Sequence, residues 1–195
     1  MQGTAGCCGG VMCMKITVVF GSHRRTGKNK EIEDMLTGLP LGHELDFIRM
    51  ADARINGCDS CFICGEEKAC VIKDDFAPIL AKLSDADAIF ILTPVYAPIP
   101  SKLTALFERL TSLLFASQLM NTTQNPLHGK PAAIFSYYSS GIADETGLKV
   151  IFQKFLMTGY SFHEVNYKYL NNCPNADEKY DRDICEYVKD VIVAM

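Results

Sequence analysis

The sequence lacks several features that would assign the protein to common functional classes. It has no run of about 18 apolar residues, the length that a membrane-spanning helix requires, so we expect no membrane segment. Its formal net charge is −4, whereas nucleic-acid binding calls for a basic surface. It also has no internal repeat, low-complexity tract or linker. We therefore expect 195 residues, 48% of them hydrophobic, to form one domain with a full core.

The first 13 residues lack the positive charge and the long apolar stretch of a secretory signal. They are rich in glycine, so we expect residues 1–13 to be a disordered extension and residues 14–195 to form the domain. We expect a cytoplasmic location. In that reducing compartment, the nine cysteines of the chain indicate metal or redox chemistry rather than a disulfide framework.

Short apolar runs alternate with segments of helical periodicity. The predicted strands are Lys15–Phe20, Glu44–Met50, Ala86–Leu92, Ala132–Ser136 and Ser161–Val165. Apolar residues at helical spacing occur at positions 32–39, 76–83, 103–114, 148–156 and 184–192. This alternation predicts an α/β fold, a doubly wound parallel sheet with helices on both faces. Ligands of such sheets bind beyond the carboxyl ends of the strands, so the loops there are the candidate site.

The loop after the first strand, Gly21–Asn29, combines hydroxyl groups, glycines and cations at the start of a helix. Such a turn suits a phosphate monoester, because backbone N–H groups and the helix dipole bind the anion while Arg24 or Lys28 adds positive charge. It is neither a dinucleotide motif, since it lacks the closely spaced glycines, nor a Walker loop, since Asn29 stands where Ser or Thr is needed. The alternative is a polar turn in which Thr26 caps the helix.

Two further loops follow the third and fourth strands. Thr93–Pro100 (TPVYAPIP) contains three prolines and Tyr96, and a flat tricyclic ring needs such a stiff, apolar surface with a few backbone donors and acceptors. The alternative is that the prolines only end the strand. Ser136–Gly141 is the third candidate loop, although serine-rich turns are common.

The order strand, GSxRxxG, helix and later TPVY resembles the NADPH-dependent FMN reductase group of flavodoxin-like proteins, from Lys15 to about Val165. The resemblance implies a five-stranded sheet of order 2-1-3-4-5, three αβα layers and an FMN cofactor. The implied FMN-binding residues are Ser22, Arg24, Thr26, Gly27, Lys28 and Asn29 in the first loop, Thr93, Pro94, Val95 and Tyr96 in the second, and Ser136, Ser139, Ser140 and Gly141 in the third. The chain departs from the group at two places. His23 stands where the group has proline, and Gly27-Lys28-Asn29 stands where it has Gly-Asn-Thr/Ser. Both changes leave the backbone N–H donors of the loop intact.

Four cysteines are clustered after the second strand, in the loop 58–70. They follow the pattern C-x2-C-x2-C-x5-C and are Cys58, Cys61, Cys64 and Cys70. Consecutive spacings of two allow thiolates to surround one 4Fe–4S cluster, as in bacterial ferredoxin motifs. Zinc fits less well, because structural zinc sites usually have two C-x2-C pairs separated by a longer stretch. A redox disulfide, or cysteines that bind no metal, are the remaining alternatives.

Together, the cysteine motif and the flavin loops resemble the iron–sulfur flavoproteins of anaerobic microbes. This resemblance implies one FMN, one 4Fe–4S cluster on the four cysteines, a homodimer or homotetramer, and electron exchange with NAD(P)H or a ferredoxin-like carrier. We therefore expect an FMN-dependent oxidoreductase or electron-transfer flavoprotein, with no side chain identifiable as a catalytic acid, base or nucleophile. The alternatives are an NAD(P)H-dependent FMN or quinone reductase without a cluster, and a zinc-stabilised binding module without enzymatic activity.

Overall fold

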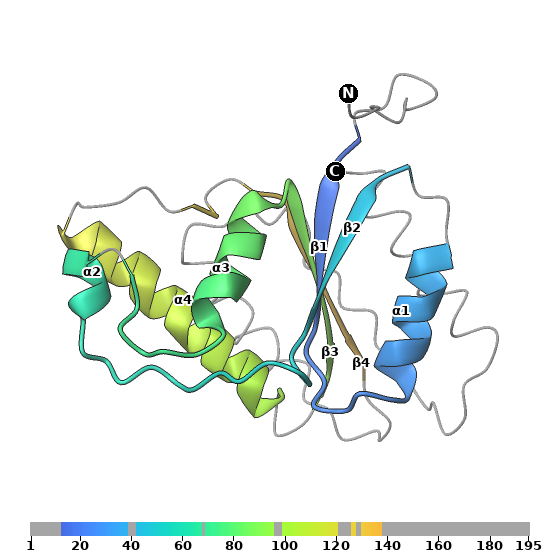
Figure 1. The fold of residues 1–195 in the computed structure, drawn as a ribbon, viewed down its shortest axis with the longest axis horizontal. Helices are drawn as coiled ribbons and strands as arrows, with labels where there is room; N and C mark the ends of the chain where they lie inside the picture. The colour runs from blue at the N-terminus through green and yellow to red at the C-terminus, as the bar shows by residue number, and fades with distance from the viewer. Residues whose placement is uncertain are drawn as a thin grey trace.

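The computed structural model describes residues 13–38, 42–67, 69–95, 99–120, 126–127 and 130–137. In this part of the chain strands alternate with helices (Figure 1). The elements are β1 (Lys15–Phe20), α1 (Lys28–Gly38), β2 (Glu44–Arg49), α2 (Ile63–Glu67), α3 (Phe76–Asp85), β3 (Ala88–Pro94), α4 (Ser101–Met120) and β4 (Ala132–Tyr137). None of these helices is both long and apolar enough to cross a membrane.

The four strands form one sheet in the order β2-β1-β3-β4, and every pair is parallel. Val18 of β1, for example, pairs with Phe47 of β2 and with Phe90 of β3. This order agrees with the first four places of the predicted topology. The predicted fifth strand, Ser161–Val165, the predicted helices near 148–156 and 184–192, and residues 1–12 lie outside the described residues. Because the strands are parallel, their carboxyl ends share the lower edge of the sheet in Figure 1.

Helices cover both faces of the sheet, so the predicted three layers are confirmed for the described residues. Figure 1 shows α1 on one face and α3 and α4 on the other, with α2 beside α4. The strands alternate accordingly: Ile16 and Val18 of β1 pack in the core under α1, near Ile32 and Leu36. Their neighbour Val19 belongs to the second core, under α3 and α4. All seven residues of β3 are buried, as expected for a central strand of a sheet covered on both faces.

Two local predictions were wrong. The third strand was expected to end at Leu92, but it continues through Thr93 and Pro94, which pair with Ser136 and Tyr137 of β4. Proline is compatible with the end of a strand, and the ladder resumes at once because the Val95 N–H donates to the Tyr137 carbonyl at 2.9 Å. The cysteine-rich segment, expected to be a loop throughout, contains the short helix α2.

Candidate cofactor site

The first loop is a tight, polar turn that leads into α1. Ser22 is buried, and its Oγ accepts a hydrogen bond from the Arg24 N–H at 3.1 Å, which tightens the turn. Gly27 has φ = +86°, a conformation that favours glycine, and its carbonyl accepts hydrogen bonds from the N–H groups of Lys30 and Glu31 in the first turn of α1. Gly27, and not Thr26, therefore lies at the helix start. Thr26 and Arg24 are exposed beside it.

The buried polar side chains next to this loop have unused hydrogen-bonding capacity. Asn29, in the first turn of α1, is 6% exposed, and its Oδ1 accepts a hydrogen bond from the Tyr137 hydroxyl of β4. The Asn29 Nδ2 and the Ser136 Oγ are buried and have no partner among the described residues. Buried polar groups are usually satisfied, so two such groups beside the carboxyl ends of β1 and β4 indicate a site for a polar ligand. Tyr137, which joins β4 to α1, lies in the predicted third loop but was not among the predicted site residues.

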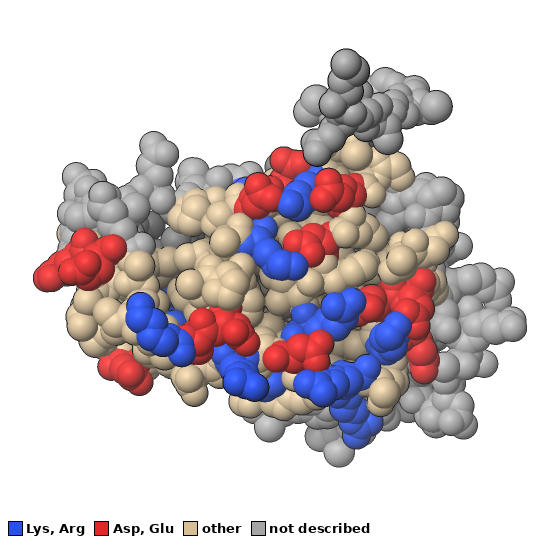
Figure 2. Space-filling view, in the orientation of Figure 1, with Lys and Arg blue, Asp and Glu red and all other residues tan. Residues whose placement is uncertain are grey.

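A hollow of about 260 Å³ opens beside the loop, between α1 and the carboxyl ends of β1 and β2. It is lined by Phe20, Ser22, Arg24, Arg25, Asn29, Lys30, Glu33, Arg49, Ala51 and Asp52. Three of these residues, Ser22, Arg24 and Asn29, were predicted as site residues. Four cations face two carboxylates here, so the hollow has an excess of positive charge that suits an anion. Figure 2 shows Lys and Arg side chains gathered, with some Asp and Glu, along this edge of the molecule.

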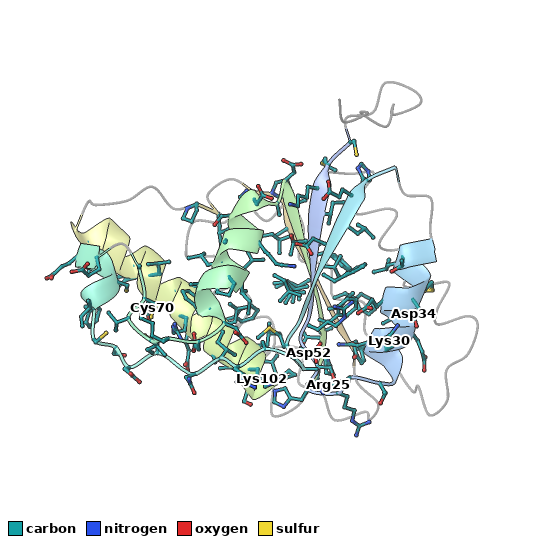
Figure 3. All side chains as sticks on the ribbon, viewed as in Figure 1. Arg25, Lys30, Asp34, Asp52, Cys70 and Lys102 are labelled. Carbon is teal, nitrogen blue, oxygen red and sulfur yellow. The ribbon has the colours of Figure 1, made fainter. Side chains whose placement is uncertain are left out.

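Ion pairs with the two carboxylates of the hollow hold two of its four cations, Arg49 and Arg25, in place. Glu33 binds Arg49 with both oxygens, at 2.5 Å to Nε and 2.7 Å to Nη2, and so joins α1 to β2. That hydrogen bond from Glu33 raises the pKa of Arg49. Arg25 pairs with Asp52 at 2.7 Å, and Figure 3 shows the two side by side at the lower edge. Both pairs join segments from different parts of the chain, so neither could be predicted from the sequence of one loop.

The second predicted loop lies next to the first. Thr93 is fully buried, and its hydroxyl donates to the Pro94 carbonyl at 3.0 Å; Val95 is half-buried. His23 of the first loop reaches across to α4, where its Nε2 accepts the Lys102 N–H at 3.3 Å. The loops after β1 and β3 are therefore neighbours, as predicted. The remaining predicted residues, Tyr96, Ser139, Ser140 and Gly141, lie outside the described residues, as does the side chain of Lys28.

The four clustered cysteines line one small cavity of about 20 Å³, against α4. None of them forms a disulfide. Burial raises the pKa of the Cys64 thiol, and the other three cysteines raise it further, which reflects their proximity. Two non-glycine residues of the loop, Ser60 and Phe62, have positive φ values of 54° and 59°, and such strain is concentrated at functional sites. The Ser60 N–H donates to Cys58 Sγ at 3.4 Å.

These thiols are close, but they are not arranged as a finished metal site. In the part of the chain that the structure describes, no three His, Cys, Asp or Glu side chains are placed to hold a metal ion. The donor set itself, four thiols and one N–H···S bond, fits an iron–sulfur cluster chemically. Figure 3 shows Cys70 well apart from Arg25 and Asp52, so the cysteine cavity and the hollow are two separate places on the molecule.

One member of a buried ion pair that was not predicted lies in the wall of the cysteine cavity. Arg109 of α4 lines it, and its guanidinium binds Asp74 through both Nη atoms. Burial raises the pKa of Asp74, but hydrogen bonds from Arg109 and from backbone N–H groups bring it below its ordinary value. Burial lowers the pKa of Arg109, but Asp74 and the adjacent Cys70 thiol raise it above its ordinary value.

Several known proteins resemble the chain in sequence. An iron–sulfur flavoprotein of Methanocaldococcus jannaschii is 35% identical over 111 residues, which are 55% of this chain and 58% of the relative. An iron–sulfur flavoprotein of Methanosarcina thermophila is 36% identical over 103 residues, 49% of this chain and 52% of the relative. The matched region thus spans about half the length of these relatives.

Solved structures confirm the flavodoxin-like fold. An NAD(P)H:quinone oxidoreductase from Methanothermobacter marburgensis superposes with a TM-score of 0.65 at 15% identity, covering 93% of this chain and 96% of the other. Flavodoxin 1 from Bacillus cereus gives a TM-score of 0.55 at 14% identity and covers 92% of this chain and 97% of the other. Residues 14–165 match the family described as NADPH-dependent FMN reductase, which is most of the chain and includes the three candidate flavin loops and the cysteine-rich segment. The protein therefore belongs to the NADPH-dependent FMN reductase family.

Proposed function

We propose that the protein is an FMN-dependent oxidoreductase whose domain, residues 14–195, binds FMN at the carboxyl ends of β1, β3 and β4. The observation that carries this proposal is the pair of buried, unpartnered groups, Asn29 Nδ2 and Ser136 Oγ, beside a glycine-containing turn at a helix start. Such groups need a polar ligand that remains in place. Family membership supports FMN as that ligand.

The first loop would hold the FMN phosphate. Backbone N–H groups at the start of α1 and the Asn29 amide would donate to its oxygens, while the cations of the adjacent hollow provide positive charge. Ser22, Arg24, Thr26, Gly27 and Lys28 complete this part of the proposed site.

The flavin ring would lie against the loop after β3, formed by Thr93, Pro94, Val95 and Tyr96, and would reach Ser136, Ser139, Ser140 and Gly141. FMN supplies hydride and single-electron chemistry, and the protein binds and orients it. The electron donor that we propose is NAD(P)H, in keeping with the family.

The test is an isosteric substitution at Asn29. Asn29→Asp removes the Nδ2 donor and adds a negative charge, so we expect FMN to bind the apoprotein at least about tenfold more weakly, a difference of about 1.4 kcal/mol. Quenching of flavin fluorescence measures the dissociation constant. Glu44→Gln, an exposed carboxylate at the amino end of β2 that does not line the hollow, is the control and should change affinity by less than about twofold. Equal affinities for wild type and Asn29→Asp would remove the basis of the proposal.

We further propose that Cys58, Cys61, Cys64 and Cys70 bind one 4Fe–4S cluster. Their shared cavity and the absence of disulfides among them support this, as do relatives described as iron–sulfur flavoproteins. Because the four sulfurs do not yet form a metal site, the loop must close around the cluster as it binds. The protein would then exchange single electrons with a ferredoxin-like carrier, as a cytoplasmic homodimer or homotetramer.

The second candidate is an NAD(P)H-dependent FMN or quinone reductase without a cluster, which the description of the family supports. Anaerobically purified protein distinguishes the two. Four irons and four acid-labile sulfides per chain, with visible absorption that dithionite bleaches, support the cluster; FMN without iron supports the reductase. Stoichiometric zinc in a colourless protein would contradict both and support the zinc-stabilised module.

A further inference from the structure

Arg109 is a buried cation beside the four cysteines, and its hydrogen bonds leave one nitrogen unused. The residue is 2% exposed. Its Nη1 donates to Asp74 Oδ2 at 2.9 Å and to the Asn56 carbonyl at 3.1 Å, and its Nη2 donates to Asp74 Oδ1 at 3.3 Å. The guanidinium carbon lies 4.4 Å from the centroid of the Phe76 ring. The remaining nitrogen, Nε, is buried and has no partner among the described residues.

These contacts fix the direction of the unused N–H. A guanidinium group is planar, so two bonds to one carboxylate also determine the orientation of Nε. Arg109 and the four cysteines line the same cavity, and the Cys70 thiol is close enough to raise the pKa of Arg109 by its charge and by a hydrogen bond. An ion pair with a purely structural role would be complete with Asp74. The unpaired Nε–H instead leaves a donor available to whatever the cysteines bind.

We propose that Arg109 is a positioning residue for the cysteine site: its Nε–H donates to a sulfur of the bound cluster, and its charge favours the reduced state. This inference rests on the proposed 4Fe–4S cluster. Reduction takes one electron from the reductant and adds one negative charge to a site that four thiolates already make negative; no bond breaks and no proton is needed. A nearby buried positive charge stabilises the more negative state, and hydrogen bonds to sulfur act in the same direction. Asp74 binds the Nη atoms and offsets only part of this effect.

The experiment compares the anaerobic, iron-loaded protein with three variants. Arg109→Gln/Asp74→Asn removes both charges of the pair and retains hydrogen-bonding groups, because removal of one partner alone would leave a buried charge unpaired. Arg109→Lys retains the positive charge. Lys82→Gln/Asp46→Asn is the matched control, since it removes an ion pair between α3 and β2 whose residues do not line the cysteine cavity. Iron, sulfide and FMN are quantified, circular dichroism verifies folding, and potentiometric titration followed by EPR measures the cluster midpoint.

We expect the neutral double variant to bind as much iron as wild type but to have a one-electron reduction constant at least tenfold lower, a shift of 59 mV. Arg109→Lys should recover most of this shift, and the control should show none. If the iron-loaded double variant has the same cluster midpoint as wild type, the proposed role of Arg109 is wrong. It is also wrong if Arg109→Lys shifts the midpoint as much as the double variant does. Wild-type protein that binds FMN but no iron overturns the cluster itself, and this inference with it, so the two failures are distinct.

Discussion

Gly21 lies where β1 ends and the first loop begins, and it has no room for a side chain. A Cβ at this position would lie 2.7 Å from Leu103 Cδ2 of α4 and 2.8 Å from Thr93 Oγ1 of β3. Both neighbours are fully buried, so neither can move aside into solvent. The Gly21 N–H also donates to the Leu92 carbonyl at 2.7 Å, which holds the backbone against β3. We therefore expect Gly21→Ala to force the first loop away from β3 and α4.

Overpacking of a buried site typically costs about 1–3 kcal/mol, and two contacts below 3.0 Å place Gly21→Ala toward the upper part of that range. The matched control is Gly38→Ala at the end of α1, where a Cβ meets nothing within 4 Å. The same chemical change there should leave the free energy of unfolding unchanged or raise it by up to about 1 kcal/mol.

Urea unfolding of the apoprotein, followed by circular dichroism, measures both variants. Leu103→Ala provides a second check, because it removes one of the clashing groups: the double variant Gly21→Ala/Leu103→Ala should be more stable than the sum of the two single effects by about 0.5–3 kcal/mol. If Gly21→Ala unfolds at the same urea concentration as Gly38→Ala, then the first loop does not pack as tightly against Thr93 and Leu103 as the structure shows.

Two further predictions concern the backbone of the first loop and the buried ion pair. A Cβ at Gly27 would meet no atom within 4 Å, so only the φ of +86° is unfavourable for Gly27→Ala. We expect the free loop to relieve this strain by leaving the turn, so FMN binding must restore it at a cost of about 1–2 kcal/mol, which weakens binding roughly five- to thirtyfold in fluorescence titrations. Wild-type affinity would contradict the proposed role of the turn. Asp74→Asn leaves Arg109 unpaired and should lower the free energy of unfolding at pH 7 by about 3–5 kcal/mol. Because the pKa of Asp74 is lowered in the folded protein, its stabilising effect is present above its unfolded pKa, about 3.9, and is lost as the pH falls through the folded value. The difference from wild type should therefore shrink below about pH 4 in urea titrations, and a difference independent of pH would contradict the assignment.

Most of the strands were predictable because their burial follows from local sequence. A strand covered by helices on both faces needs a continuous apolar segment, and Lys15–Phe20 and Ala132–Tyr137 have that composition. The end of β3 was not predictable, because a Thr-Pro pair is a common strand terminator. It continues the ladder here only because β4 is in register with it.

The cation-lined hollow could be predicted only in part. Ser22, Arg24 and Asn29 belong to one recognisable loop, whereas Arg49 and Asp52 come from the strand and loop beside it. Nothing in the local sequence around Arg49 distinguishes it from an ordinary surface residue. Its place at the site depends on the pairing of β1 with β2 and on its bonds to Glu33.

The sequence by itself determined the alternation of strands and helices, the turn at Gly27 and the spacing of the four cysteines, because each depends on neighbours within a few residues. Only the tertiary structure decided that Asn29 meets Tyr137, 108 residues away, and that Arg109 meets Asp74, 35 residues away, beside the cysteines. Such contacts arise when packing of the apolar faces brings distant segments together, and the polar groups then enclosed must find partners or be left for a ligand.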